Sequence, residues 1–426
     1  MPKMLTDAPE APAVDTLIED FRQVRRSTEA LCAGLATEDF VVQSMEDVSP
    51  TKWHLAHTSW FFETFLLRPH AAGYRPLDDA YGYLFNSYYV QAGERHCRDQ
   101  RGYISRPTVA EVFEYRHHVD QAIETMLESA DEPTRRNLQS LITLGLHHEQ
   151  QHQELMLTDI KHVFSVNPLR PVFRDREVES TRGSALRWCG FDEGVYWIGH
   201  DGDGFAYDNE RPRHRRFVEA FEIADRLTTN GEYLEFMADG GYRHPELWLS
   251  LGWATLQERA WTEPFYWERR DGEWWLFSLS GMRRVEPNEP VCHLNYFEAD
   301  AFARWSGARL PSEAEWEVAA HGAPVAGNLV EAAAFHPRPA HAGGDGPRQM
   351  FGDVWEWTSS QYEAYPGFEP EPGAIGEYNG KFMCNQFVLR GGSCVTAASH
   401  IRPSYRNFFP PDASWQFTGL RLARNA

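Results

Sequence analysis

The sequence predicts a chain of two parts, an N-terminal bundle of α-helices followed by a larger α+β region. Residues 1–165 carry apolar residues at helical spacing and few glycines. Beyond residue 185, glycine, tryptophan and proline become frequent and helical periodicity weakens. The 426 residues, 42% of them hydrophobic, suffice for two or three domains with sizeable cores. We therefore expect domains at 1–165 and 186–426, joined by a linker at 166–185.

Four long segments in the first part have helical periodicity. Pro50 and Pro107 precede two of them, and proline is tolerated where a helix begins. Four helices of this length favour an antiparallel bundle, whose interior is a usual place for metal sites. The aromatic and basic connection Tyr74–Pro107 is expected to be ordered rather than disordered. The predicted helices are Asp15–Leu35, Thr51–Leu67, Thr108–Ser129 and Pro133–Phe164.

The second part predicts short elements separated by turns. The segment Asn167–Gly183, with Pro168 and Pro171 in a polar context, is typical of a linker. Short apolar segments between turn signals predict strands, and only two segments have clear helical spacing. These are the strands Val195–Ile198 and Phe387–Leu389 and the helices Asn230–Ala238 and Glu298–Trp305.

Composition excludes several classes of protein. The formal net charge of −21 disfavours nucleic acid and anionic membranes as partners. No apolar run is long enough to span a membrane, and Met1–Asp15 lacks the apolar core of a secretion signal. The six cysteines form no CxxC pair. A cytoplasmic chain with reduced thiols is expected, and its oligomeric state stays open.

Residues 147–154, His-His-Glu-Gln-Gln-His-Gln-Glu, are the most informative stretch of the chain. Positions four apart share one helix face, so His148 and His152 point the same way and can bind one transition metal. A third ligand is available in the second helix, where His57 shares a side with Trp53 and Trp60. The simpler alternatives are a solvated polar helix face and a core histidine. We predict His57, His148 and His152 as the ligand set.

The spacing leaves the metal and its chemistry open. His148-Glu149-Gln150-Gln151-His152 also fits the zincin pattern, in which the glutamate is the general base of a zinc peptidase. Three histidines on one face of an octahedral metal leave open positions for a substrate and O2, which suits non-haem Fe(II). Zinc more often keeps four ligands in total.

Six segments of the C-terminal half follow one another in order: Tyr207–Pro212, Ala238–Tyr242, Ala308–Trp316, Gly352–Thr358, Arg390–Ser393 and Gly419–Arg421. Through these segments the C-terminal half resembles the formylglycine-generating-enzyme (sulfatase-modifying factor) domain, a variant of the C-type lectin fold. Its tryptophans Trp316, Trp355 and Trp357 are expected in the core. That family uses two cysteines after its Gly-Gly-Ser motif, whereas only Cys394 follows Ser393 here, so copper-thiolate chemistry is not expected.

The N-terminal half, with its HxxxH helix and partner histidine, resembles a DinB-type metal-binding bundle. The combination resembles the sulfoxide synthases of ergothioneine biosynthesis (EgtB family). This resemblance implies an enzyme that uses non-haem Fe(II) and O2 to join the sulfur of cysteine or γ-glutamylcysteine to the imidazole of Nα-trimethylhistidine. It also makes His57, His148 and His152 the iron ligands.

The resemblance assigns further roles. Gln151 matches the glutamine that hydrogen-bonds the substrate imidazole. Tyr88 and Tyr89 match the tyrosine acid, with neither preferred over the other. Asn407 and Phe408 match the pair that flanks the trimethylammonium group, for which aromatic faces are natural partners.

Arginines suit the carboxylate of the sulfur donor because they bind it through two hydrogen bonds. Arg98, Arg101 and Arg106 in the long connection are the predicted contacts. Members that use γ-glutamylcysteine carry an acidic residue and an arginine shortly after the asparagine–aromatic pair. Here Phe409, Pro410 and Pro411 follow instead, which favours free cysteine.

Other functions remain open at this point. A sister synthase would act on unmethylated histidine or take a selenium donor, and cysteine dioxygenation is expected as a side reaction. In a different class, the chain would be a non-catalytic lectin-like binding module whose histidines hold a structural zinc.

Overall fold

The structure is a computed structural model that describes residues 14–176, 183–341, 343–344 and 346–426. It divides into two compact units, the first comprising residues up to Met156 together with Asp201–Phe205, and the second comprising Leu157–His200 and Ala206–Ala426. Within the predicted linker, residues 177–182 lie outside the described part of the chain. No helix of the described residues combines the length and apolar character that a membrane span requires.

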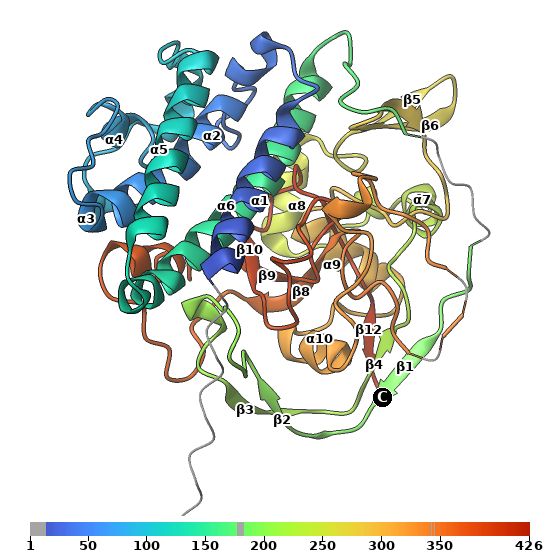
Figure 1. The fold of residues 1–426 in the computed structure, drawn as a ribbon. Coiled ribbons are helices and arrows are strands. Elements are labelled where there is room, and N and C mark those ends of the chain that lie inside the picture. The colour runs from blue at the N-terminus through green and yellow to red at the C-terminus, as the bar shows by residue number, and fades with distance from the viewer. Residues whose placement is uncertain (1–13, 177–182, 342, 345) are drawn as a thin grey trace, which may run out of the picture. The chain divides into compact units, whose positions relative to one another are not determined.

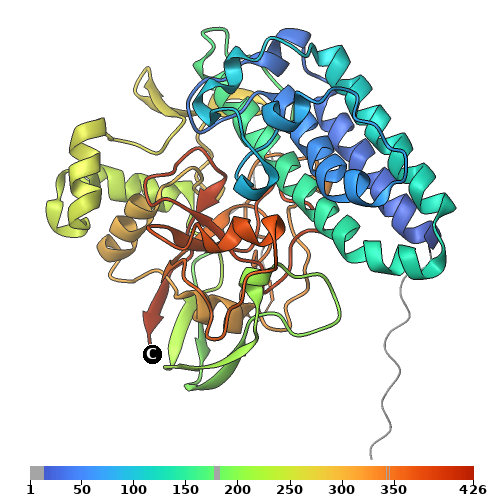
Figure 2. The same cartoon turned by 90° about the vertical axis from the view of Figure 1, so that its left-hand side faces the viewer.

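The first unit is a bundle of four long helices that lie side by side in both views (Figures 1 and 2). The helix α2 (Thr51–Phe62) continues through a wider π-helical turn, Glu63–Leu67, into the short helix α3, Arg68–His70. All four helices predicted from periodicity are confirmed, with ends shifted by a few residues. They are α1 (Val14–Cys32), α2 (Thr51–Phe62), α5 (Val109–Ser129) and α6 (Glu132–Val166).

The helix α2 lies at the centre of the bundle, since all twelve of its residues are buried. Helix α6 approaches it closely at Gly145, where an added Cβ atom would lie 2.4 Å from the ring of Phe62. A side chain at this position would therefore push the two helices apart. Glycine at 145 thus permits the interhelical distance at which histidines of α2 and α6 can meet.

Local hydrogen bonds fix where α5 begins. The hydroxyl of Thr108 accepts from the backbone N–H of Glu111, and the Glu111 carboxylate accepts from the N–H of Thr108. This reciprocal capping box satisfies backbone donors that have no partner within the helix.

The long connection between α3 and α5 is ordered, as predicted. It contains α4 (Tyr81–Leu84) and two 3-10 turns, Val90–Ala92 and Arg98–Tyr103. The side chain of Asn86 donates to the carbonyls of Tyr89 (3.1 Å) and Gly93 (3.0 Å). These bonds close the segment on itself and give its polar backbone partners.

The second unit contains four small sheets in its described residues (Figure 1). All pairs between its strands are antiparallel except that of β11 (Thr418–Gly419) with β8 (Trp355–Gln361), which is parallel. The predicted strands at 195–198 and 387–389 are confirmed as β2 and β9. The sheets are β1-β4-β12 (Trp188–Phe191, Phe221–Ala224, Ala423–Asn425), β10-β9-β8-β11 (Asn407–Phe409, Phe387–Arg390, Trp355–Gln361, Thr418–Gly419), β2-β3 (Gly194–Ile198, His214–Val218) and β5-β6-β7 (Trp267–Arg270, Glu273–Ser278, Gly281–Arg284).

The helices of this unit correct one prediction. The helices at α7 (Asn230–Ala238) and α9 (Tyr296–Trp305) are confirmed. The expectation of only two clear helices was wrong, because α8 (Ser250–Arg259) and α10 (Glu313–Ala320) are also present, with a last short turn, α11, at Glu377–Gly380. Every residue of α10 is buried, so this helix lacks the alternation between apolar and polar faces that periodicity detects.

The core of the second unit contains the three tryptophans predicted there. Trp316, Trp355 and Trp357 are fully buried, and the indole of Trp316 donates to the carboxylate of Glu356 at 3.0 Å. Cys394 is buried as a small side chain, as expected. None of the six cysteines, all within the described residues, forms a disulfide.

Candidate metal centre

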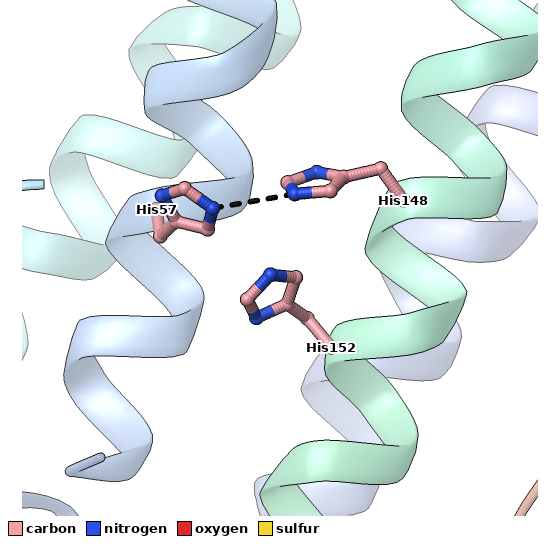
Figure 3. Close-up of side chains that lie close together, drawn as sticks. All are labelled: His57, His148 and His152. Carbon is pink, nitrogen blue, oxygen red and sulfur yellow. Dashed lines mark hydrogen bonds between the residues drawn. The ribbon is translucent and has the colours of Figure 1, made fainter. Parts of the chain in front are cut away.

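Three histidines converge inside the bundle of the first unit. His57 comes from α2, while His148 and His152 lie one turn apart on α6 (Figure 3). One ring nitrogen from each lies within 4.8 Å of the others, and the Nε2 atoms of His57 and His148 are 3.2 Å apart. All three side chains are buried. The structure therefore brings together the three histidines that the sequence predicts as ligands.

The second ring nitrogen has a partner for two of the three histidines. The Nδ1 of His57 donates to the backbone carbonyl of Phe85 at 2.6 Å, and the Nδ1 of His152 lies 2.8 Å from the Nδ1 of His54. Among the described residues, the Nδ1 of His148 has no hydrogen-bond partner. A bond at Nδ1 presents Nε2 to a metal and orients the ring.

His54 is a residue that sequence analysis missed. Trp53 and Trp60 indicate one inward side of the second helix, which includes His57 and leaves His54 aside. Because α2 is buried on every side, His54 is buried as well and reaches α6. Its position three residues before His57 could have indicated it, because residues three apart on a helix lie next to each other on the helix surface.

Aromatic rings hold the ligand side chains in place. The ring of His57 stacks between Trp53 (centroids 4.6 Å apart, 11°) and Trp60 (5.3 Å, 14°). His148 stacks on Phe61 at 4.6 Å. These contacts restrict ring rotation and exclude water, which preorganises the site.

Electrostatics keep the three imidazoles neutral. Burial lowers the pKa of His148 to about 4, against the opposing effect of Glu149. Burial, followed by neighbouring histidines, holds the pKa values of His57 and His152 well below the ordinary range. Neutral imidazoles have a lone pair to donate, so the group is ready to bind a metal at neutral pH. The three nitrogen donors on two rigid helices fit a first-row transition metal.

Glu149 does not serve the histidines. Its carboxylate is fully buried and accepts from Arg25 (2.7 Å), Arg116 (3.0 Å) and Thr28 (2.6 Å). Burial alone would raise the pKa of Glu149, but the charges of Arg25 and Arg116 outweigh it and lower the pKa to about 2. A carboxylate engaged in this way cannot act as the general base of a zinc peptidase, so the zincin alternative loses its catalytic residue.

His147 and Gln151 flank the ligand pair on α6. The ring of His147 stacks on Phe205 of the segment Asp201–Phe205, with centroids 4.0 Å apart. It is therefore engaged outside the ligand group. Gln151, the predicted substrate contact, is half-buried beside His152.

The two candidate tyrosines differ in environment. Tyr89 is buried and lies 5.7 Å from the ring of Trp60, which itself stacks on His57. Tyr88 is half-buried, and its hydroxyl accepts from Arg98 at 2.7 Å. Tyr89 thus packs beside the aromatic wall of the metal centre, whereas Tyr88 is paired with one of the predicted arginines.

The other predicted arginines differ in exposure. Arg101 is buried, with its guanidinium 3.3 Å from the centroid of Trp53 and bonded to Ser49 (2.8 Å) and Ser87 (3.3 Å). Arg106 is exposed and donates to the carbonyl of the preceding residue. Arg98 and Arg101 therefore share one segment with the tyrosines, while Arg106 faces solvent.

The predicted trimethylammonium contacts lie in the second unit. Phe408 on β10 stacks on Tyr362, with centroids 4.0 Å apart and an angle of 12°. Phe382 and Tyr378 lie 5.7 and 6.4 Å from the same ring. The side-chain oxygen of Asn407 accepts from the N–H of Phe408. The structure thus places Phe408 in an aromatic cluster.

Comparison with known families agrees with both parts of the fold. Residues 20–156 match the DinB superfamily, and residues 191–343 and 340–426 match the sulfatase-modifying factor enzyme 1-like domain. The formylglycine-generating enzyme of Streptomyces coelicolor is 29% identical over 275 residues, which cover 53% of this chain and 84% of that protein. A DinB-type bundle with a buried three-histidine group, joined to such a domain, defines a class of metal-binding oxidoreductase.

Other relatives match a larger share of this chain with higher identity. A hercynine oxygenase of Mycolicibacterium thermoresistibile is 34% identical over 420 residues, covering 88% of this chain and 87% of that protein. A hercynine oxygenase of Mycolicibacterium smegmatis is 35% identical over 314 residues, covering 66% of this chain and 70% of that protein. The chain belongs to the hercynine oxygenase family.

Proposed function

We propose that this chain is a non-haem iron, O2-dependent sulfoxide synthase that joins the sulfur of cysteine to the imidazole of hercynine (Nα-trimethylhistidine). The observation that carries the proposal is the buried, neutral three-histidine group in a member of the hercynine oxygenase family. In the proposed reaction a thiol S–H and an imidazole C–H bond break, and a C–S bond forms. One oxygen atom of O2 enters the sulfoxide and the other leaves as water, which balances the four-electron oxidation.

His57, His148 and His152 would hold the iron, and their number leaves coordination positions for substrates. Iron, when bound, would activate O2 for reduction by electrons from the two substrates. We assign proton donation during this reduction to the pair Tyr88 and Tyr89, since a phenol donates a proton without binding iron strongly. Tyr89→Phe and Tyr88→Phe, compared in product yield and in the ratio of sulfoxide to cysteine dioxygenation, distinguish the two hydroxyls.

Hercynine recognition is assigned to Gln151, Asn407 and Phe408. An amide such as Gln151 can donate to and accept from a neutral imidazole. The aromatic cluster at Phe408 supports the assignment, because a trimethylammonium group donates no conventional hydrogen bond and is attracted to ring faces.

The carboxylate of cysteine is assigned to Arg98, Arg101 and Arg106. The buried position of Arg101 supports this most strongly, because a guanidinium away from bulk water binds an anion with less screening. The residues after Asn407 and Phe408, which lack a nearby arginine, support free cysteine over γ-glutamylcysteine.

The test is O2 uptake by protein loaded anaerobically with Fe(II), with the product identified by mass. Hercynine with cysteine is compared with hercynine and γ-glutamylcysteine, with histidine and cysteine, and with hercynine and a selenium donor. We expect the cysteine–hercynine sulfoxide as the main product. No uptake above that with cysteine alone would overturn the proposal.

The non-catalytic alternative makes a different prediction. A lectin-like module with a structural zinc would retain stoichiometric zinc when purified without added metal and would show no O2 chemistry with any substrate pair. Metal analysis of the protein as purified, run beside the uptake assay, separates these outcomes.

A further inference from the structure

We propose that His54 is a positioning residue of the metal centre, whose Nδ1 accepts the Nδ1–H of His152 and thereby fixes the tautomer in which the Nε2 of His152 binds the metal. The inference rests on the proposed metal centre but not on the identity of the substrates.

The direction of the hydrogen bond follows from the geometry of His152. Its Nε2 lies on the side that faces His57 and His148, and its Nδ1 faces away from them (Figure 3). That Nδ1 lies 2.8 Å from the Nδ1 of His54. Two ring nitrogens at this distance share one proton, so one of them donates and the other accepts.

Only one of the two arrangements leaves His152 able to bind a metal. If His54 donated, neutral His152 would carry its own proton on Nε2, the atom that faces the other two ligands. If His152 donates, its Nε2 keeps a lone pair for the metal, and His54 carries its proton on Nε2. The metal-competent state therefore requires His54 as the acceptor.

The helix α2 thus acts on the metal centre twice. It supplies His57 as a ligand and, three residues earlier, His54 as the partner of a ligand on α6. His54 is 3% exposed, so water does not readily replace it as an acceptor. The bond from His57 to the carbonyl of Phe85 plays the corresponding part for that ligand.

A structural role in the core would give a different result from a positioning role. Leucine at 54 keeps an apolar volume but offers no acceptor, whereas the side-chain oxygen of asparagine can stand where Nδ1 stands. Loss of a partner of this kind typically weakens metal affinity by about 10–100-fold. His54→Leu is therefore expected to lose affinity in that range, and His54→Asn to stay within about threefold of the native protein, well short of that loss.

The test measures metal affinity in the full chain, without substrate or O2. Fe(II) and Co(II) are titrated anaerobically against a chromophoric chelator in the native protein, His54→Leu, His54→Asn and the control His162→Leu. His162 is a buried histidine further along α6, so its loss controls for removing a buried imidazole. Thermal denaturation checks that each variant is folded.

A second measurement needs no variant. Long-range nitrogen–proton NMR of the Zn(II)-loaded protein, labelled at histidine, reports which nitrogen of each ring carries the proton. We expect protons on Nδ1 of His152 and Nε2 of His54. Native-like affinity in His54→Leu, equal losses in both variants, or a proton on the Nδ1 of His54 would each overturn the proposal. Absence of sulfoxide product with intact metal affinity would instead count against the proposed reaction.

Discussion

Replacing Glu149 with glutamine is expected to destabilise the helical bundle by about 3–5 kcal/mol, the usual cost of removing one partner from a buried ion pair. The magnitude follows from the contacts of its carboxylate. Two buried guanidinium groups, those of Arg25 and Arg116, donate to it at 2.7 and 3.0 Å. Charge-assisted bonds contribute about 1.5–3 kcal/mol each. Glutamine keeps the shape but removes the countercharge that the two cations share, so that among the described residues Arg25 retains only Asp120 (2.8 Å) and Arg116 only Glu29 (3.5 Å) as ion-pair partners.

The assay is urea denaturation of the metal-free protein, followed by far-ultraviolet circular dichroism, for the native chain and Glu149→Gln. The matched control is Glu128→Gln on the exposed part of α5, expected to change the free energy of unfolding by less than about 0.5 kcal/mol. Adding Arg116→Met to Glu149→Gln should recover part of the loss, because it removes a buried cation whose remaining ion pair is the longer one with Glu29 (3.5 Å).

The same variant decides between structure and catalysis. Folded Glu149→Gln should bind metal within about tenfold of the native affinity, less than the typical effect of removing a direct partner of a ligand. A loss of stability below about 1 kcal/mol, far from the range for a buried pair, would refute the structural role, most clearly if activity were lost at the same time.

Gly145→Val should lower the free energy of unfolding by about 1–3 kcal/mol, because the new side chain overpacks against Phe62, and should also weaken metal binding. Phe62→Leu in the same chain should partly restore both stability and metal binding. Unchanged thermal stability of Gly145→Val would contradict the close approach of the two helices. Burial raises the pKa of Glu298 to about 7, whereas in the unfolded chain this carboxyl has its ordinary pKa near 4.5. Between these two pH values the folded state holds a proton that the unfolded state has released. The free energy of unfolding therefore falls as pH rises from 4.5 through 7, by up to about 3 kcal/mol. Glu298→Gln should abolish this pH dependence. In urea denaturation, the stability of the variant relative to the native protein should therefore rise between pH 4.5 and pH 8. A stability difference between the two proteins that does not change with pH would count against this prediction. Arg101→Met should raise the KM for cysteine more than about tenfold, which corresponds to the loss of one charged hydrogen bond. The KM for hercynine should stay within about threefold of the native value. Equal changes in the two KM values would indicate that Arg101 only packs on Trp53 and does not bind cysteine.

The features predicted from sequence are those that depend on local spacing. Long amphipathic helices such as α5 and α6 can be predicted because apolar residues recur along the sequence with the helical period. The pairing of His148 with His152 follows because residues four apart lie one helical turn apart. His57 could be added because tryptophans marked one side of its helix. The aromatic content of the connection before α5 predicted that this segment is ordered and not disordered.

The features that could not be predicted depend on packing between distant segments. The partners of Glu149 lie 124 and 33 residues away in sequence, so no local pattern indicates that its carboxylate faces α1 and α5. The helix α10 was missed because it is buried on all sides. His54 was missed for the same reason, since a helix at the centre of a bundle has no outward face.

The central claim, that His57, His148 and His152 form one iron site, is tested most directly by anaerobic Fe(II) titration of four variants. We expect a single Fe(II) per native chain and none in His57→Ala, His148→Ala or His152→Ala. His147→Ala, which removes the histidine that stacks on Phe205 beside the site, should keep full stoichiometry. Native protein that binds no Fe(II), or a ligand variant that still binds it stoichiometrically, would contradict the account.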